Sequence, residues 1–206
     1  MPPSAHAGPP NLTIATAKAA LRAELAAKRD AAAAADPRAG DRLAAMFPEA
    51  LAPPAGAVVS GFLRFRSEID PAPLMARLAA AGCVLALPRT PKTAGPALSF
   101  HRWTPGDPLT RSGFGVLEPS PDAPLVAPDL VLSPLLGFDR AGGRIGYGRG
   151  HYDRTLASLR ALKPVTVVGV GFAAQEVVAV PMEPTDERLD WILTPDFCVR
   201  AGQDSG

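Results

Sequence analysis

The sequence predicts a single α/β domain in which helices cover a mainly parallel central sheet. Residues 58–63 form a short apolar run typical of a buried strand, residues 72–81 have helical character, and residues 83–88 form a second apolar run. A strand, a helix and a strand in this order form a crossover that joins two parallel strands. The chain has 206 residues, of which 47% are hydrophobic and 20% charged, so we expect one soluble domain with its own core.

A long helix is predicted before this unit, over residues 15–35. The stretch has no glycine or proline and few residues that favour strands, and Leu21 and Leu25 lie one turn apart. The pair Asp36-Pro37 ends this helix, because proline restricts the residue before it. A second, short helix is predicted over residues 41–51.

The second half of the chain repeats the alternation of strands and helices. Residues 98–103 predict a strand, and the region 105–128, rich in proline and glycine, contains only the short extended piece 114–119. Four elements follow: a strand over residues 129–135, a helix over 151–161, a strand over 165–172 and a last strand over 191–194. We expect residues 1–12 and 201–206 to be flexible, because chain ends fray.

Charge and composition exclude several classes of protein. The net charge is only +1, so we expect no nucleic acid or membrane partner, and any anion site must be local. The start of the chain lacks the pattern of a secretory signal, and no apolar run approaches the roughly 18 residues that span a membrane, so we expect a cytoplasmic protein. Cys83 and Cys198 fit no zinc-binding spacing and are expected to be buried thiols, with a disulfide as the open alternative.

A glycine-rich segment lies between the strand predicted at 129–135 and the helix predicted at 151–161. It contains Gly142, Gly143, Gly146, Gly148 and Gly150. Glycine permits positive φ and close approach to a ligand, and the start of a helix offers N–H donors to a phosphate. Four arginines and two aspartates between residues 139 and 154 give a local net charge of +2. The pattern fits phosphate binding or a tight turn without a ligand; it is neither a Walker A loop nor a dinucleotide fingerprint.

The stretch Gly137-Phe138-Asp139, followed after a short spacer by residues 144–153, resembles the signature of the 5-formyltetrahydrofolate cyclo-ligase family. The family pattern reads approximately G-F-D-x-x-G-x-R-L-G-x-G-x-G-Y-Y-D. Other landmarks fall in the family's order at residues 18–22, 67–70, 87–89, 115–119 and 175–194. His151 stands where the family usually has tyrosine, and Arg149 replaces a more common glycine or lysine, so fine specificity stays open.

The resemblance implies ATP- and Mg²⁺-dependent cyclisation of 5-formyltetrahydrofolate to 5,10-methenyltetrahydrofolate, with release of ADP and phosphate. In this reaction the formyl oxygen is phosphorylated and N10 attacks to close the ring, which needs positioning and charge neutralisation more than a protein nucleophile. The fold it implies is a single three-layer, Rossmann-like domain over residues 1–206, with the site at the carboxyl ends of the strands. We expect this domain to act as a monomer.

Matching the family's positions residue by residue gives the expected site. The catalytic residues are Arg144, Arg149 and Tyr152. The ATP-binding residues are Lys18, Ala19, Ala20, Leu21, Arg22, Ile145, Gly146, Tyr147, Gly148, Arg149, Gly150, His151, Tyr152 and Asp153. The folate-binding residues are Leu63, Glu68, Gly148, Arg149, Gly150, His151 and Tyr152. Asp153 and Asp186 are expected to bind Mg²⁺, a hard cation that takes one or two carboxylates together with phosphate oxygens and water.

Alternative interpretations are open for these residues and for the function. Lys18, Arg22 and Arg29 share one helix face, which is more often simply a solvated surface. Each of Asp153 and Asp186 also fits a helix-end or cap residue, and Glu68 an acid at a helix start. The other functions considered are a paralogue acting on a different formamide or a thiamine-related compound, a nucleotide- or RNA-binding module, and a sugar-phosphate isomerase that needs no ATP.

Overall fold

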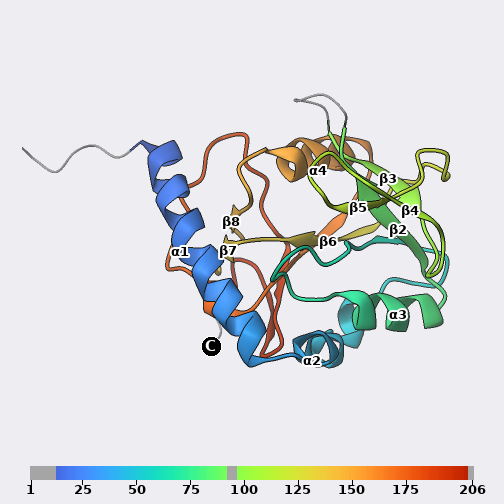
Figure 1. The fold of residues 1–206 in the computed structure, drawn as a ribbon, viewed down its shortest axis with the longest axis horizontal. Helices are drawn as coiled ribbons and strands as arrows, with labels where there is room; N and C mark the ends of the chain where they lie inside the picture. The colour runs from blue at the N-terminus through green and yellow to red at the C-terminus, as the bar shows by residue number, and fades with distance from the viewer. Residues whose placement is uncertain (1–12, 92–96, 204–206) are drawn as a thin grey trace, which may run out of the picture.

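A seven-stranded sheet forms the centre of the computed structural model, which describes residues 13–91 and 97–203 (Figure 1). The strands of this sheet, in spatial order, are β11 (Cys198–Arg200), β10 (Trp191–Leu193), β9 (Thr166–Val170), β6 (Leu130–Pro134), β1 (Val58–Ser60), β2 (Val84–Arg89) and β3 (Ser99–Arg102). The five inner strands are parallel, and only the two edge strands β3 and β11 pair antiparallel. The predicted mainly parallel sheet is confirmed.

The predicted helices form with bounds close to those expected. The helical segments are α1 (Ile14–Ala35), α2 (Ala39–Met46), η1 (Glu49–Leu51), α3 (Ala72–Ala80), α4 (His151–Leu162) and η2 (Ala173–Gln175). The helix predicted over residues 41–51 is instead divided into α2 and η1, because Pro48 cannot continue an α-helix.

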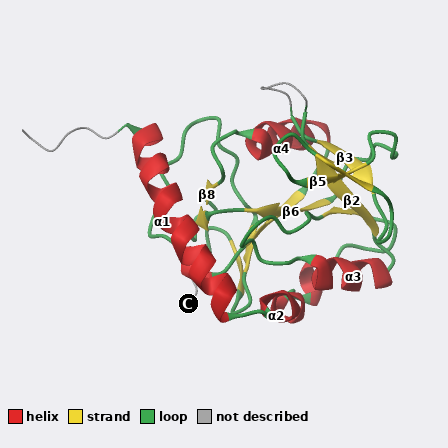
Figure 2. Cartoon of the chain, in the orientation of Figure 1, coloured by secondary structure: helices red, strands yellow, loops and turns green. Residues whose placement is uncertain are grey.

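Alternate residues of each strand pack on opposite faces of the sheet. Leu130 and Leu132 of β6 lie in the same core as Leu78 of α3, while Val131 lies in the core that contains Leu156 of α4. Figures 1 and 2 show α2 and α3 together below the sheet and α4 above it. The chain is therefore a three-layer α/β fold, as predicted.

The direction of the chain reverses between β1 and β6. From β1 it proceeds through α3 to β2 and β3, and from β6 it proceeds through α4 to β9 and β10 on the other side. The connections after the neighbouring strands β1 and β6 leave in opposite directions, so a crevice forms at the carboxyl ends of these two strands. Ligands of open α/β sheets bind at such switch points.

Two small hairpins are added to this frame. They are formed by β4 (Leu109–Arg111) with β5 (Leu117–Pro119), and by β7 (Gly137–Phe138) with β8 (Arg144–Ile145). The side chain of Asp139 closes the second hairpin, because its two oxygens accept the N–H groups of Gly143 and Val180 at 2.8 and 2.7 Å. Helix α1 packs on this hairpin and on η2, so it crosses the edge where the parallel strands end (Figure 1).

The end of the chain and the cysteines differ in part from expectation. Strand β11 was not predicted, and the N–H groups of Ala201 and Gly202 after it are hydrogen bonded, so the described part of the tail is held in place. Residues 1–12 and 204–206, also expected to be flexible, lie outside the described residues. Both cysteines are free thiols, but only Cys83 is buried, and Cys198 is half-buried. Within the described ranges, no helix has the length and apolarity needed to cross a membrane.

Candidate functional site

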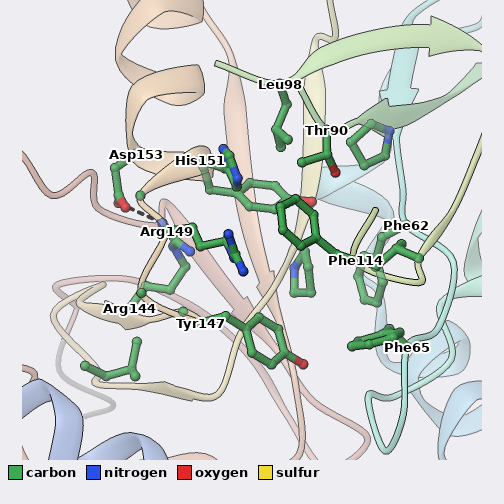
Figure 3. Close-up of a pocket in the computed structure, with 18 of the residues that line it drawn as sticks. Phe62, Phe65, Thr90, Leu98, Phe114, Arg144, Tyr147, Arg149, His151 and Asp153 are labelled. Atoms are coloured by element: carbon green, nitrogen blue, oxygen red, sulfur yellow. Dashed lines mark hydrogen bonds and ion pairs between the residues drawn. The ribbon is translucent and has the colours of Figure 1, made fainter. Parts of the chain in front are cut away.

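A cavity of about 850 Å³ opens at the switch point between β1 and β6 (Figure 3). Its walls come from the residues that follow β1, the end of β2, the tip of the β4–β5 hairpin, and the stretch from β8 into α4. Helix α1 contributes Lys18 and Arg22 from one side. The cavity therefore lies at the carboxyl ends of the parallel strands, where the sequence predicted a site.

Most of the predicted site residues meet in this cavity. Its wall includes Lys18, Arg22, Leu63, Glu68, Arg144, Ile145, Gly146, Tyr147, Gly148, Arg149, Gly150, His151, Tyr152, Asp153 and Asp186. The structure does not bring Ala19, Ala20 or Leu21 to it: the two alanines are exposed, and Leu21 packs against the core beneath α1. Successive helix residues are rotated by roughly 100°, so only Lys18 and Arg22, one turn apart, face the cavity.

The glycine-rich segment places its backbone against α1. Gly148 and Gly150 have φ of +87° and +62°, and Gly150 precedes the first turn of α4 without a side-chain cap from any described residue. The Nε of Arg22 donates to the carbonyl of Gly146 at 2.9 Å, and its guanidinium lies so close to Gly148 that a Cβ there would be 3.1 Å from Cζ. The predicted need for positive φ is confirmed at these two glycines.

Arg144 is a buried cation in the part of the cavity wall that leads from β8 into α4. Its Nη2 donates to Oδ1 of Asp153 at 2.7 Å, and its guanidinium lies 5.5 Å from the centre of the Tyr152 ring (Figure 3). The Nε of Arg144 is buried and has no hydrogen-bond partner within the described ranges. A buried guanidinium with an unused N–H is a ready donor to an anion, since leaving that donor unpaired costs free energy.

Lys18 binds two carboxylates at the edge of the cavity. Its Nζ lies 2.5 Å from Oδ2 of Asp186 and 2.9 Å from Oε2 of Glu183. Desolvation disfavours the charged ammonium, but the hydrogen bonds and charges of Asp186 and Glu183 outweigh it and raise the pKa of Lys18. Lys18 and Arg29 are both buried, so the interpretation of their helix face as a solvated surface is wrong.

Glu68, in the loop after β1, is a buried acid that lines the cavity. Its two oxygens accept the Phe65 N–H at 3.0 Å and the Tyr147 hydroxyl at 2.7 Å. Burial raises the pKa of Glu68, and these hydrogen bonds and the charge of Arg29 partly oppose the rise. Desolvation and the Glu68 carboxylate raise the pKa of Tyr147 to about 12. Since α3 begins only at Ala72, Glu68 is not an acid at a helix start.

Aromatic rings cover the wall between these polar groups. Figure 3 shows Phe62, Phe65, Phe114 and Tyr147 around the cavity, and the guanidinium of Arg149 lies 3.9 Å from the centre of the Phe114 ring. The sequence interpretation did not assign the phenylalanines. The available signal was position, because Phe62 and Phe65 lie within five residues of the carboxyl end of β1.

Two further acids, Glu118 and Glu183, also line the cavity and were missed as site residues. Glu118 is buried and accepts the Thr90 N–H at 2.8 Å, which ties the β4–β5 hairpin to the end of β2. Both acids lie in stretches that matched the family's order, but the local sequence gave no indication of their partners.

The residues present fit a Mg²⁺ ion that is shared with phosphate groups. Asp153 and Asp186 both face the cavity, and the described part of the chain contains no cluster of three or more histidine, cysteine or acidic side chains that would hold a metal by themselves. Mg²⁺ usually binds one or two carboxylates and completes its shell with phosphate oxygens and water. Each aspartate already forms an ion pair with a cation, Asp153 with Arg144 and Asp186 with Lys18. The two carboxylates therefore lie where they balance positive charge.

Comparison with known proteins places the chain in a family. Residues 14–195 match the model of the 5-formyltetrahydrofolate cyclo-ligase family. The 5-formyltetrahydrofolate cyclo-ligase of Escherichia coli K12 is 34% identical over 141 residues, which are 66% of this chain and 77% of that protein. That of Haemophilus influenzae is 37% identical over 100 residues, 47% of this chain and 53% of that protein.

The fold agrees with this match. The solved structure of Aquifex aeolicus 5,10-methenyltetrahydrofolate synthetase superposes with a TM-score of 0.70 at 23% identity, and the alignment covers 92% of this chain and 95% of that one. The family signature in the sequence, the cavity that gathers its residues and the match over nearly the whole chain agree with one another. The chain belongs to the 5-formyltetrahydrofolate cyclo-ligase family of enzymes.

Proposed function

We propose that the protein uses this cavity to convert 5-formyltetrahydrofolate and ATP into 5,10-methenyltetrahydrofolate, ADP and phosphate. The observation that supports the proposal most is that one cavity contains both halves of such a site: the arginine- and glycine-rich head of α4, and the buried Glu68 with its aromatic surroundings. In this proposal the protein works as a cytoplasmic monomer.

The chemical difficulty is the leaving group. A formamide oxygen leaves poorly, but after transfer of the γ-phosphoryl group it leaves as phosphate when N10 attacks the formyl carbon and closes the ring. The protein must hold the two substrates in line and neutralise charge, which requires no covalent intermediate with the chain.

The folate half of the cavity suits a flat, hydrogen-bonding ring. Phe62, Phe65 and Leu63 offer apolar surface beyond β1, and the carboxylate of Glu68 accepts hydrogen bonds from ring N–H and amino groups. The buried position of Glu68 strengthens such bonds, because little water competes for them.

The nucleotide half supplies donors to phosphate oxygens. These are the unused Nε–H of Arg144, the guanidinium of Arg149, the backbone from Gly148 to Gly150 and the cations of α1. Burial, and then the nearby carboxylate of Glu68, raise the pKa of Tyr152, so at neutral pH its hydroxyl is a hydrogen-bond donor and not a base.

Asp153 and Asp186 would hold Mg²⁺ in this proposal. The ion would neutralise negative charge on the transferred phosphoryl group and on the ADP that leaves. Lys18 forms ion pairs with both Asp186 and Glu183 and would stay near the phosphates as a second cation.

The experiment is a turnover assay with purified protein, 5-formyltetrahydrofolate and MgATP. We expect the near-ultraviolet absorbance of the methenyl product to grow, with one ADP released per product, and neither signal without ATP or in Asp153→Ala. Folded protein that gives no product would overturn the proposal. Binding of RNA that weakens steeply with salt would favour a nucleic-acid module, and conversion of a sugar phosphate without ATP would favour an isomerase.

A further inference from the structure

Arg29 joins three segments of the chain behind the folate half of the cavity. From α1 it reaches Ser67 in the loop after β1 and Tyr147 in the glycine-rich segment. We propose that Arg29 is a positioning residue for folate recognition: it fixes the Tyr147 hydroxyl and thereby orients the carboxylate of Glu68 toward the substrate. The inference rests on the proposed function, because it takes the folate to bind at Glu68.

The contacts of Arg29 are those of a buried structural cation. The residue is 3% exposed, its Nη1 donates to the Tyr147 hydroxyl at 2.5 Å, and its Nε donates to Oγ of Ser67 at 2.9 Å. Ser67 in turn donates to Asp30, the next residue of α1. Arg29 itself is not part of the cavity wall, so any effect on the substrate must pass through its partners.

The chemistry of the three groups fixes the direction of the hydrogen bonds. A guanidinium can only donate and an ionised carboxylate can only accept. The Tyr147 oxygen therefore accepts from Arg29, and its proton points to Oε1 of Glu68 at 2.7 Å. The other oxygen of Glu68 accepts the Phe65 N–H, so both ends of the carboxylate are held.

Arg29 is also the cation that favours the charged form of this acid. The titratable and charged groups that act on or respond to Glu68 are Arg29 from α1, Tyr147 from the glycine-rich segment and Tyr152 from α4, and the Phe65 N–H adds a backbone hydrogen bond. Burial raises the pKa of Glu68, while the charge of Arg29 lowers it, so removal of Arg29 raises it further.

The position of Arg29 on α1 links the two halves of the site. It lies on the same helix face as Lys18 and Arg22, which reach the nucleotide half. Arg29 is eleven positions after Lys18, a rise of about 16.5 Å along the helix. One rigid helix thus holds the glycine-rich segment at two points, through Arg22 at Gly146 and through Arg29 at Tyr147.

The test compares Arg29→Met with Lys28→Met. Lys28 is the neighbouring cation of α1, is 44% exposed and forms an ion pair with Glu24 on the surface. For Arg29→Met we expect the KM for 5-formyltetrahydrofolate to rise about tenfold or more, the effect of one hydrogen bond to a charged group, while the KM for ATP changes less than about twofold. The acid limb of the folate kcat/KM profile should move to higher pH. Lys28→Met should change none of these.

Two further variants separate positioning from folding. Tyr147→Phe removes the hydroxyl and keeps Arg29, and it should cause a similar folate-specific loss; in the double variant the losses should not add, because both act through one relay. Arg29→Lys keeps the positive charge but lacks the planar guanidinium with its several N–H donors. The acid limb of its kcat/KM profile for folate should therefore lie at the wild-type pH, while only part of the wild-type folate affinity is retained.

The inference is overturned if folded Arg29→Met matches Lys28→Met in folate KM and pH profile, or if its loss falls equally on ATP and folate. Calorimetric binding of 5-formyltetrahydrofolate needs no turnover, so it decides the role of Arg29 separately. A wild-type protein that binds the folate but forms no product contradicts the proposed reaction and leaves the comparison of affinities valid.

Discussion

The guanidinium of Arg144 donates to the carboxylate of Asp153, nine positions later, at 2.7 Å. This ion pair closes the glycine-rich segment into a loop whose two ends are tied together at the head of α4. The side chain of Arg144 is 5% exposed and that of Asp153 is 22% exposed, so water screens the pair only in part. The pair restrains the backbone between them, which in the proposed function lowers the entropy cost of binding a phosphate group.

Arg144→Met should remove both the phosphate donor and the partner of Asp153. We expect kcat/KM for ATP to fall about 10²- to 10³-fold, as for loss of one preorganised donor, and the free energy of unfolding to fall by about 2 kcal/mol. Arg140→Met is the matched control on the same hairpin, since Arg140 pairs with Glu176 at the surface and should contribute at most about 1 kcal/mol. Equal activity losses in the two variants would contradict the assignment.

The order of strands and helices followed from local patterns, because buried parallel strands are continuous apolar runs. The extended piece predicted at 114–119 contains β5, but β4 and the pair β7–β8 were not predicted, because they lack the apolar run that marks the equally short β1 and β10. Strand β11 was missed for the same reason, and its pairing with β10 is decided by tertiary contacts.

The residues of one continuous segment stand out in the sequence by themselves, whereas the site residues on distant segments, such as Lys18, Glu68 and Asp186, were expected only from the family resemblance. The residues 144–153 were found as a motif, but the partners of Lys18 are Glu183 and Asp186, more than 160 positions away. Local sequence could therefore not distinguish a buried cation from a solvated one. The helix rotation that removes Ala19 and Ala20 from the cavity is, by contrast, a consequence of helix geometry and was available from the sequence.

Gly148→Ala tests whether the glycine-rich loop must approach α1. Gly148 and Gly106 both have positive φ, of +87° and +103°, so alanine should destabilise the fold at each by about 1–2 kcal/mol. A Cβ at Gly148 would lie 3.1 Å from Cζ of Arg22, whereas a Cβ at Gly106 meets nothing within 4 Å among the described residues. We expect kcat/KM for ATP to fall about tenfold or more only in Gly148→Ala. A similar fall in Gly106→Ala would mean that backbone strain alone is responsible.

Asp186→Asn tests the metal site. The free Mg²⁺ concentration that gives half-maximal activity should rise about tenfold or more, and Mn²⁺ binding in the presence of a non-hydrolysable ATP analogue, measured by electron paramagnetic resonance, should weaken in parallel. Glu187→Gln is the neighbouring control, because Glu187 pairs with Arg160 and its carboxylate does not line the cavity. Unchanged Mn²⁺ affinity in Asp186→Asn would remove Asp186 from the metal site. Chelation of Mg²⁺ should abolish turnover reversibly.

Glu68→Gln should weaken the binding of 5-formyltetrahydrofolate and raise the stability of the fold at neutral pH. The folded-state pKa of Glu68 is raised above its ordinary value of 4.5, mainly by burial, so folding favours the protonated acid. The contribution of Glu68 to the stability of the wild type therefore falls as pH rises from about 4.5 through the raised pKa, and this contribution is not regained at higher pH. A glutamine does not titrate, and its amide can accept from the Phe65 N–H and donate to Tyr147.

Thermal melts across pH should show this difference directly. At pH below about 4.5 the two proteins should melt at similar temperatures, and at neutral pH Glu68→Gln should melt higher, while its KM for 5-formyltetrahydrofolate rises. A melting temperature that stays below the wild-type value at every pH would mean that the carboxylate stabilises the fold. If the wild type instead gains stability relative to Glu68→Gln as pH rises over this range, the pKa of Glu68 is lowered and not raised, and the hydrogen bonds of Phe65 and Tyr147 outweigh its burial.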